Sequence, residues 1–125
     1  MVSRLAMLGR TSILVISAVA VMIQAPVVAK RSQECATIYA DVGYSGASTE
    51  ICGDVSFVGW DWNDTISSVR VPEGFVLVLY EHENYGGAVF TIYADDPDLR
   101  EYTGPGGDGT WNDAASSLRF YDIWP

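Results

Sequence analysis

The stretch WNDTISS at residues 62–68 decides the fold, because it returns 49 positions later as WNDAASS at residues 111–117. A single copy of Asn, Asp, two variable residues and two serines favours a turn whose side chains cap backbone amides. Two copies at matching places favour an oxygen cage. Calcium takes about six to eight hard oxygen ligands, and such a loop offers carboxylate, carbonyl and hydroxyl oxygens within a few residues.

A second motif opens each half of this internal repeat: an aromatic residue, four residues, another aromatic, one residue and a glycine. Its members are Tyr39, Tyr44 and Gly46, and at an offset of 41 Tyr80, Tyr85 and Gly87. The two rings can pack on each other across a hairpin turn, while glycine supplies a backbone conformation that a Cβ would obstruct. The pattern predicts a folded hairpin that lies over a sheet in each half.

Outside these motifs the chain shows short runs rich in β-branched and aromatic residues, separated by Gly, Asp, Asn and Pro. We therefore predict an all-β fold, a two-sheet sandwich of about eight strands. The expected strands are 36–41, 47–52, 57–60, 67–71, 75–80, 88–93, 99–102 and 116–121.

The two halves are expected over about 36–71 and 75–121, with residues 72–74 (PEG) as the hinge between them. The change of offset from 41 to 49 places about eight extra residues in the second half. We predict that they form a surface loop within residues 95–109, which are rich in Asp, Gly and Pro.

Residues 1–29 have the pattern of a secretory signal peptide. Arg4 and Arg10 precede an uncharged apolar run from Ile13 to Ile23, which is shorter than the roughly 20 residues that cross a bilayer as a helix. A permanent transmembrane anchor is the weaker interpretation. We expect cleavage after Ala29, a mature domain over residues 30–125, and a free protein in the extracellular space.

Two cysteines, Cys35 and Cys52, remain after this processing. Export to an oxidising compartment predicts a disulfide between them, which would close a loop and stabilise the domain by roughly 3 kcal/mol. A zinc site would need further ligands, and His82 is the only histidine in the chain.

Charge limits the partners of the mature chain. Without Arg4 and Arg10, five basic residues remain against 16 acidic ones, which gives a formal charge of −11. Such a surface repels nucleic acid and anionic membranes and favours cations. A divalent metal ion is therefore the expected partner.

No catalytic constellation stands out. A Ser, His and acid triad would need His82, which follows Glu81 in a predicted hairpin turn, and no spacing singles out a pair of carboxylates. We expect a protein that is not an enzyme. The four tryptophans could bind carbohydrate, but their positions near strand ends favour packing in the core. They are Trp60, Trp62, Trp111 and Trp124.

These motifs resemble those of the βγ-crystallin superfamily, especially its microbial calcium-binding members, and the resemblance covers residues 36–121. It implies a Greek-key sandwich of the βγ-crystallin type, with two Greek keys in one domain. It also implies that the chain binds about two Ca²⁺ ions through two paired loops.

The resemblance further implies a role for each motif residue. The expected calcium ligands are side-chain oxygens of Asp64 and Asp113, carbonyls of Thr65 and Ala114, hydroxyls of Ser67 and Ser116, and carbonyls of Ala40 and Glu81. Each aspartate is expected to reach toward the neighbouring site. Four further residues would shape the loops by hydrogen bonds: Asn63, Ser68, Asn112 and Ser117.

The same family suggests an alternative function. Some secreted bacterial proteins of this fold inhibit metalloproteases and others resemble killer toxins, so a protease or a cell-surface target is the partner that this alternative implies. No residue pattern in the chain specifies a reactive loop. The two intact calcium motifs favour calcium binding as the main function.

Overall fold

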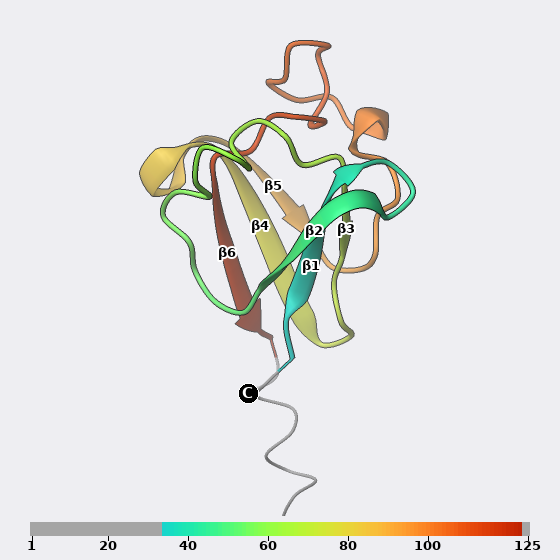
Figure 1. Cartoon of the computed structure of the whole chain (residues 1–125). Coiled ribbons are helices and arrows are strands. Elements are labelled where there is room, and N and C mark those ends of the chain that lie inside the picture. Colours follow the sequence, from blue (N-terminus) through green and yellow to red (C-terminus); the bar gives the residue numbers. More distant parts are fainter. Residues whose placement is uncertain (1–33, 124–125) are drawn as a thin grey trace, which may run out of the picture. The chain divides into compact units, whose positions relative to one another are not determined.

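Two antiparallel sheets of three strands each form the part of the chain that the computed structural model describes, residues 34–123 (Figure 1). The first sheet has the order β2-β1-β3 and comprises β1 (Ala36–Asp41), β2 (Ser45–Ile51) and β3 (Ser68–Arg70). The second has the order β5-β4-β6 and comprises β4 (Phe75–His82), β5 (Gly86–Ile92) and β6 (Ser117–Asp122). Two short 3₁₀ turns, η2 (Glu83–Tyr85) and η3 (Leu99–Glu101), complete the elements.

The predicted signal peptide over residues 1–29 lies outside the described residues. Within residues 34–123, no helix is long and apolar enough to cross a membrane.

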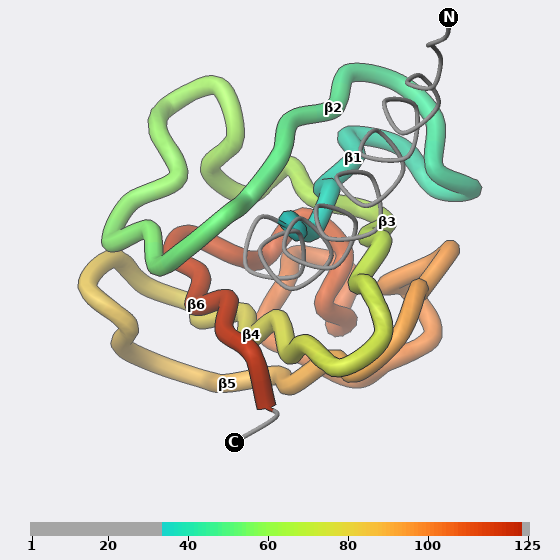
Figure 2. Tube along the Cα trace, turned by 90° about the horizontal axis from the view of Figure 1, so that it is seen from below, coloured from blue at the N-terminus to red at the C-terminus, as the bar shows by residue number. Residues whose placement is uncertain are grey.

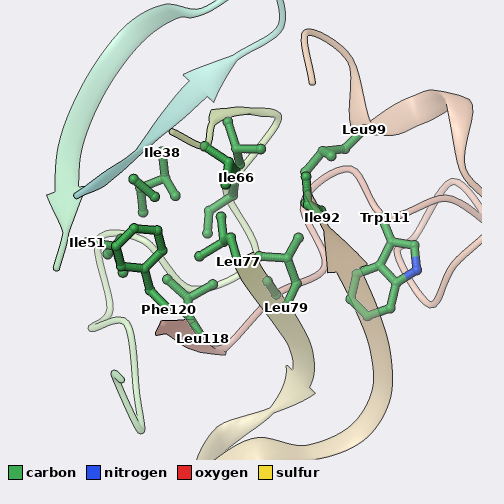
Figure 3. Close-up of a cluster of buried hydrophobic side chains, with 14 of the residues drawn as sticks. Ile38, Ile51, Ile66, Leu77, Leu79, Ile92, Leu99, Trp111, Leu118 and Phe120 are labelled. Carbon is green, nitrogen blue, oxygen red and sulfur yellow. The ribbon is translucent and has the colours of Figure 1, made fainter. Parts of the chain in front are cut away.

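The two sheets lie as two layers when the domain is viewed from below (Figure 2). Their facing side chains form one core, in which Leu77 and Leu79 of β4 and Leu118 of β6 point toward the first sheet (Figure 3). Fully burying a Leu or Ile side chain contributes about 1.5–3 kcal/mol, so this cluster is the main source of stability. The fully buried large side chains of the core are Ile38, Ile66, Val69, Val76, Leu77, Leu79, Leu99 and Leu118.

The all-β fold is confirmed, but two of the eight predicted strands do not form. Residues 57–60 belong to a loop, and most of residues 99–102 belong to η3. Just before each of them, a single bridge connects the chain to the sheet of the other half, at Val55 in the first half and at Asp96 in the second. Pro97 follows Asp96 directly with a fixed φ angle, and the turn η3 begins two residues later at Leu99, so the chain leaves the extended conformation that a longer ladder needs.

Each of these bridges crosses to the sheet of the other half. Val55 pairs with Leu118 of β6, and Asp96 pairs with Val69 of β3. Figure 1 shows the segment after β2 passing beside β6. The halves are therefore interlocked by exchanged segments, and neither sheet could form its native edge without the other half.

Both motif hairpins fold as predicted. The rings of Tyr39 and Tyr44 meet edge to face at 5.8 Å, and those of Tyr80 and Tyr85 at 5.5 Å. Gly46 and Gly87 have φ angles of +80° and +77°, and a Cβ at either position would collide with side chains of the preceding strand.

The predicted disulfide is confirmed between Cys35 and Cys52. It joins the residues that flank the first pair of the β1–β2 ladder, Ala36 and Ile51. The second half has no cysteine at all, so this covalent link reinforces the first Greek key alone.

The extra residues of the second half lie between Leu99 and Trp111, a narrower range than the predicted 95–109. The amide of Val58 donates to Ser116 O at 3.0 Å, and the amide of Leu99, 41 positions later, donates to Ser67 O at 3.0 Å. The offset of 41 therefore persists as far as Leu99. Asp95 and Asp96 have the composition of a loop but serve the fold, since Asp96 is buried and Asp95 accepts the amide of Val71 at 2.8 Å.

The predicted core placement of the tryptophans holds for two of them. Trp111 is buried against Phe90, with the ring centroids 5.7 Å apart, and Trp62 packs on the core while partly exposed. Trp60 is 82% exposed, so its predicted burial is wrong. Trp124 lies outside the described residues.

Candidate metal-binding loops

The two motif loops lie against each other and are joined by main-chain hydrogen bonds. The amide of Asp64 donates to Ala115 O at 3.1 Å, and the amide of Asp113 donates to Ile66 O at 3.0 Å. Both aspartates have left-handed backbone conformations, with φ angles of +55° and +56°. Asp adopts this region more readily than most residues, because its short polar side chain can bond locally.

The first cluster of oxygen atoms comprises Thr65, Ser67 and Asp113. The hydroxyl Oγ of Ser67 lies 3.4 Å from the carbonyl of Thr65 and 3.2 Å from Oδ1 of Asp113. The carboxylate of one loop thus reaches the hydroxyl of the other. The amide of Ser67 donates to Tyr39 O at 2.9 Å, which brings the next residue of β1, Ala40, beside this loop.

The second cluster lines a hollow of about 220 Å³. Its lining includes Asp64, Glu81, Ala114 and Ser116, the four residues that the family resemblance assigns to one site, and also Asp113, which the resemblance assigns to the other. The amide of Ser116 donates to Tyr80 O at 2.9 Å, the counterpart of the bond between Ser67 and Tyr39. The aspartate again comes from the opposite loop.

The wall of this hollow includes residues that the sequence motifs did not assign to a site: His82, Pro105, Gly106 and Gly107. The last three belong to the extra segment between Leu99 and Trp111. Its position just before the second motif was the available signal, but the sequence does not say which way such a loop folds.

Negative charge is concentrated around the two motif loops, where Asp64, Asp108 and Asp113 influence one another. Removal of water from the Asp113 carboxyl by the surrounding atoms raises its pKa, and the negative charges of Asp108 and Asp64 raise the pKa further, while hydrogen bonds from Ser67 and Asn112 oppose the shift. Holding several carboxylates near one another costs free energy, and a cation between them would relieve that repulsion.

The last serine of each motif bonds to a hairpin and points away from the clusters. Oγ of Ser68 donates to Asp41 O at 2.6 Å and accepts the amide of Tyr44 at 3.0 Å. Oγ of Ser117 donates to His82 O at 2.6 Å and accepts the amide of Tyr85 at 2.9 Å. These bonds hold each motif loop to the hairpin of its own half.

The asparagines carry two buried acceptors with no partner among the described residues. Nδ2 of Asn63 lies 3.4 Å from Oδ2 of Asp64, and Nδ2 of Asn112 lies 3.1 Å from Oδ2 of Asp113. Oδ1 of both asparagines is buried and accepts no hydrogen bond. An unpaired buried oxygen is costly, and its occurrence at the same place in both loops fits a bound cation or an ion-bound water.

The donor set fits calcium better than zinc. Within residues 34–123, the only three thiol, imidazole or carboxylate donors that lie within 4.8 Å of one another belong to Cys35, Glu50 and Cys52. The two cysteines form the disulfide and cannot bind a metal. The motif loops offer one carboxylate each among neutral oxygens, which is a hard-oxygen set suited to Ca²⁺.

Comparison with known proteins identifies the family. Residues 29–92 match the sequence model of a known family, peptidase inhibitor family I36. The chain belongs to this family and is a βγ-crystallin domain. A βγ-crystallin domain from Flavobacterium johnsoniae is 31% identical, with a TM-score of 0.61 over 74% of this chain and 99% of that one. A βγ-crystallin domain from Clostridium beijerinckii is 29% identical, with a TM-score of 0.58 over 70% of this chain and 98% of that one.

The N-terminal domain of protein S shares the fold at 24% identity, with a TM-score of 0.60 over 72% of this chain and 98% of that one. No protein among the curated sequences matches the chain. An inhibitor family points to a protein that is not an enzyme and whose target is a peptidase. The family and the disulfide together point to an extracellular protein.

Proposed function

We propose that this chain is an extracellular βγ-crystallin domain that binds about two Ca²⁺ ions and is stabilised by them. The observation that supports this most directly is the meeting of Asp64, Glu81, Ala114 and Ser116 around one polar hollow. These residues come from three separate parts of the chain, and each offers an oxygen ligand of the kind that calcium prefers.

Two sites follow from the two clusters. In the first, the carbonyls of Ala40 and Thr65, the hydroxyl of Ser67 and the carboxylate of Asp113 hold one ion. In the second, the carbonyls of Glu81 and Ala114, the hydroxyl of Ser116 and the carboxylate of Asp64 hold the other. Because each aspartate crosses to the other loop, each ion would tie the two Greek keys together.

The expected effect is on stability. A ligand that binds only the folded state stabilises it by RT ln(1 + [L]/Kd) for each site, which is roughly 2.7 kcal/mol per site when free calcium is about 100 times the Kd of that site. One carboxylate per site predicts a modest affinity, on the order of micromolar to hundreds of micromolar, as in extracellular calcium modules.

Calorimetric titration of the metal-stripped protein tests the proposal. We expect about two Ca²⁺ ions per chain and weak competition from Mg²⁺, which demands a smaller octahedral site. Asp64→Ala and Asp113→Ala should each weaken binding, whereas Asp61→Ala should not, since exposed Asp61 lies outside both clusters. No calcium-dependent heat at millimolar metal would contradict the proposal.

We also propose that the mature chain begins at Lys30, after cleavage of a signal peptide at Ala29. The apolar run and the two preceding arginines support this. The intact mass of the protein recovered from the culture medium would show the cleavage site directly, and a protein that stays in the cell with residues 1–29 attached would contradict it.

Peptidase inhibition is the second candidate function, and the family match over residues 29–92 favours it. It is compatible with calcium binding, because a stabilised scaffold resists the peptidase that it blocks. The test is whether the purified protein, at a concentration equal to that of the enzyme, blocks a thermolysin-like metalloprotease.

A further inference from the structure

We propose that the side chain of Trp60 anchors this domain in an apolar pocket of its target peptidase. Trp60 lies in the loop of residues 57–62, which we call the tryptophan loop. The inference rests on the second candidate function, peptidase inhibition, and does not depend on calcium binding.

Trp60 stands out by its exposure. Six large apolar side chains of the described residues are exposed, and among them only Trp60, at 82%, and Val89, at 54%, lie within the range that the inhibitor family model matches. A tryptophan carries a large apolar surface that proteins normally cover at least in part. Its presentation to solvent here marks a surface that a partner would cover.

The indole is held in place by a neighbouring ring. The rings of Phe57 and Trp60 meet nearly edge to face, with their centroids 5.1 Å apart and their planes at 74°. Because Phe57 is itself only partly exposed, it provides a base on which the indole rests. The exposed ring therefore has a preferred direction before any partner arrives.

The backbone of the tryptophan loop is fixed on both sides of Trp60. Before it, the amides of Val55 and Val58 donate to Leu118 O at 2.8 Å and to Ser116 O at 3.0 Å. After it, the carbonyl of Gly59 accepts the amides of Trp62 at 3.1 Å and Asn63 at 2.9 Å. A loop ordered before binding loses little conformational entropy on binding, which favours tight association.

The chemistry of the loop selects the kind of pocket. Tryptophan is among the residues that most often dominate the affinity of protein interfaces, usually by filling a dry pocket of the partner. The neighbouring Asp61 is exposed and the protein is strongly acidic, so a pocket with an acidic floor, as in trypsin, would repel this loop. A peptidase whose specificity pocket is large and apolar fits best.

Inhibition constants test the inference. The full mature protein, in saturating calcium, would be titrated against thermolysin and chymotrypsin as enzymes with apolar pockets and against trypsin as the contrast. Four variants would follow: Trp60→Ala, Trp60→Phe, and the matched controls Val89→Ala and Tyr121→Ala, which remove exposed apolar side chains elsewhere. Melting temperatures and calcium titrations of each variant would establish that it is folded.

We expect inhibition of at least one enzyme with an apolar pocket and little inhibition of trypsin. Trp60→Ala should raise the inhibition constant by about 30-fold or more, the effect of losing a dominant interface residue, while both controls change it little. Trp60→Phe should keep most of the inhibition. Trp60→Ala should melt near the wild-type temperature, because a side chain this exposed contributes little to the core.

Three results would overturn the inference. If the wild type inhibits and Trp60→Ala inhibits equally well, the anchor lies elsewhere, although the inhibitor function stands. If trypsin is inhibited most strongly, the pocket is not apolar. If the wild type inhibits none of the three enzymes at stoichiometric concentration, the inhibitor function and the anchor fall together, while the calcium proposal remains to be judged by its own titration.

Discussion

The two Greek keys share one hydrogen-bond framework but are reinforced differently. Ser68 and Ser117 each tie a motif loop to a hairpin, and Arg70 and Arg119 each lie 3.8 Å from the centre of a tyrosine ring of the hairpin in their own half. The disulfide reinforces the first half alone. The second half instead has a longer connection that leads to the buried Trp111.

That connection is where the halves diverge most. Val58 and Trp62 are four positions apart, whereas their counterparts Leu99 and Trp111 are 12 apart. The short connection leaves Trp60 exposed. The long one forms a hairpin, with a bridge between Thr103 and Thr110, that adds residues to the wall of the second hollow. Equivalent motif loops therefore sit in unlike surroundings, and the two proposed calcium sites should not behave alike.

Removal of the disulfide is expected to have the largest effect. Replacing Cys35 and Cys52 by serine frees a loop of 17 residues, which should lower the free energy of unfolding by about 3 kcal/mol. Urea unfolding of the oxidised wild type and the double variant measures this. A loss well below 1 kcal/mol would show that the first Greek key does not depend on its covalent link.

Truncation of the hairpin tyrosines tests how far the halves are equivalent. Tyr39 and Tyr80 are both half-buried and pack edge to face on a second tyrosine, so Tyr39→Ala and Tyr80→Ala should each lower the free energy of unfolding by about 2 kcal/mol, less than the loss of a fully buried ring would. Thermal unfolding of the two variants under one condition gives the comparison. Losses that differ severalfold would break the equivalence of the hairpins.

Shortening the long connection should have the smallest effect on the fold and a selective effect on binding. Replacing residues 103–110 by a two-residue turn removes Pro105, Gly106 and Gly107 from the second hollow but leaves the core intact. We expect the free energy of unfolding of this variant to lie within about 1 kcal/mol of the wild-type value, since exposed loops contribute little to stability.

In a calcium titration of this shortened variant, the binding step of the second site should weaken while that of the first stays unchanged. The Asp64→Ala and Asp113→Ala variants identify which step belongs to which site. Equal changes in both steps would show that the connection acts on the whole domain and not on its own site.

The sequence predicted the features that short-range chemistry determines. The paired tyrosines and their glycines specify each hairpin within eight residues, and the two motif loops recur with the same residue types, so both are recognisable from the residues alone. The disulfide followed from having two cysteines in an oxidising compartment.

The features that the sequence did not predict depend on distant parts of the chain. The segments around Val55 and Asp96 pair with strands of the other half. Each makes a bridge at a single residue, which is too short to produce the alternation of apolar and polar residues by which a strand is recognised in a sequence. The exposure of Trp60 depends on the path of the short connection between Val58 and Trp62, and amino-acid composition does not predict that path. The pairing of the proposed ligands across the two loops came from the family resemblance, not from spacing.

Thermal unfolding of the metal-stripped protein, with saturating calcium or with chelator, tests the central claim most directly. If calcium binds the paired loops of the folded state, each bound ion should stabilise the domain by roughly 2.7 kcal/mol at about 100 times its Kd, and even one such site in a domain of this size raises the melting temperature by about 10 °C or more while strand content stays the same. Asp61→Ala should show the same rise, and a variant with both Asp64 and Asp113 replaced by Ala should show none. Equal melting temperatures of the wild type with and without saturating calcium would contradict the account.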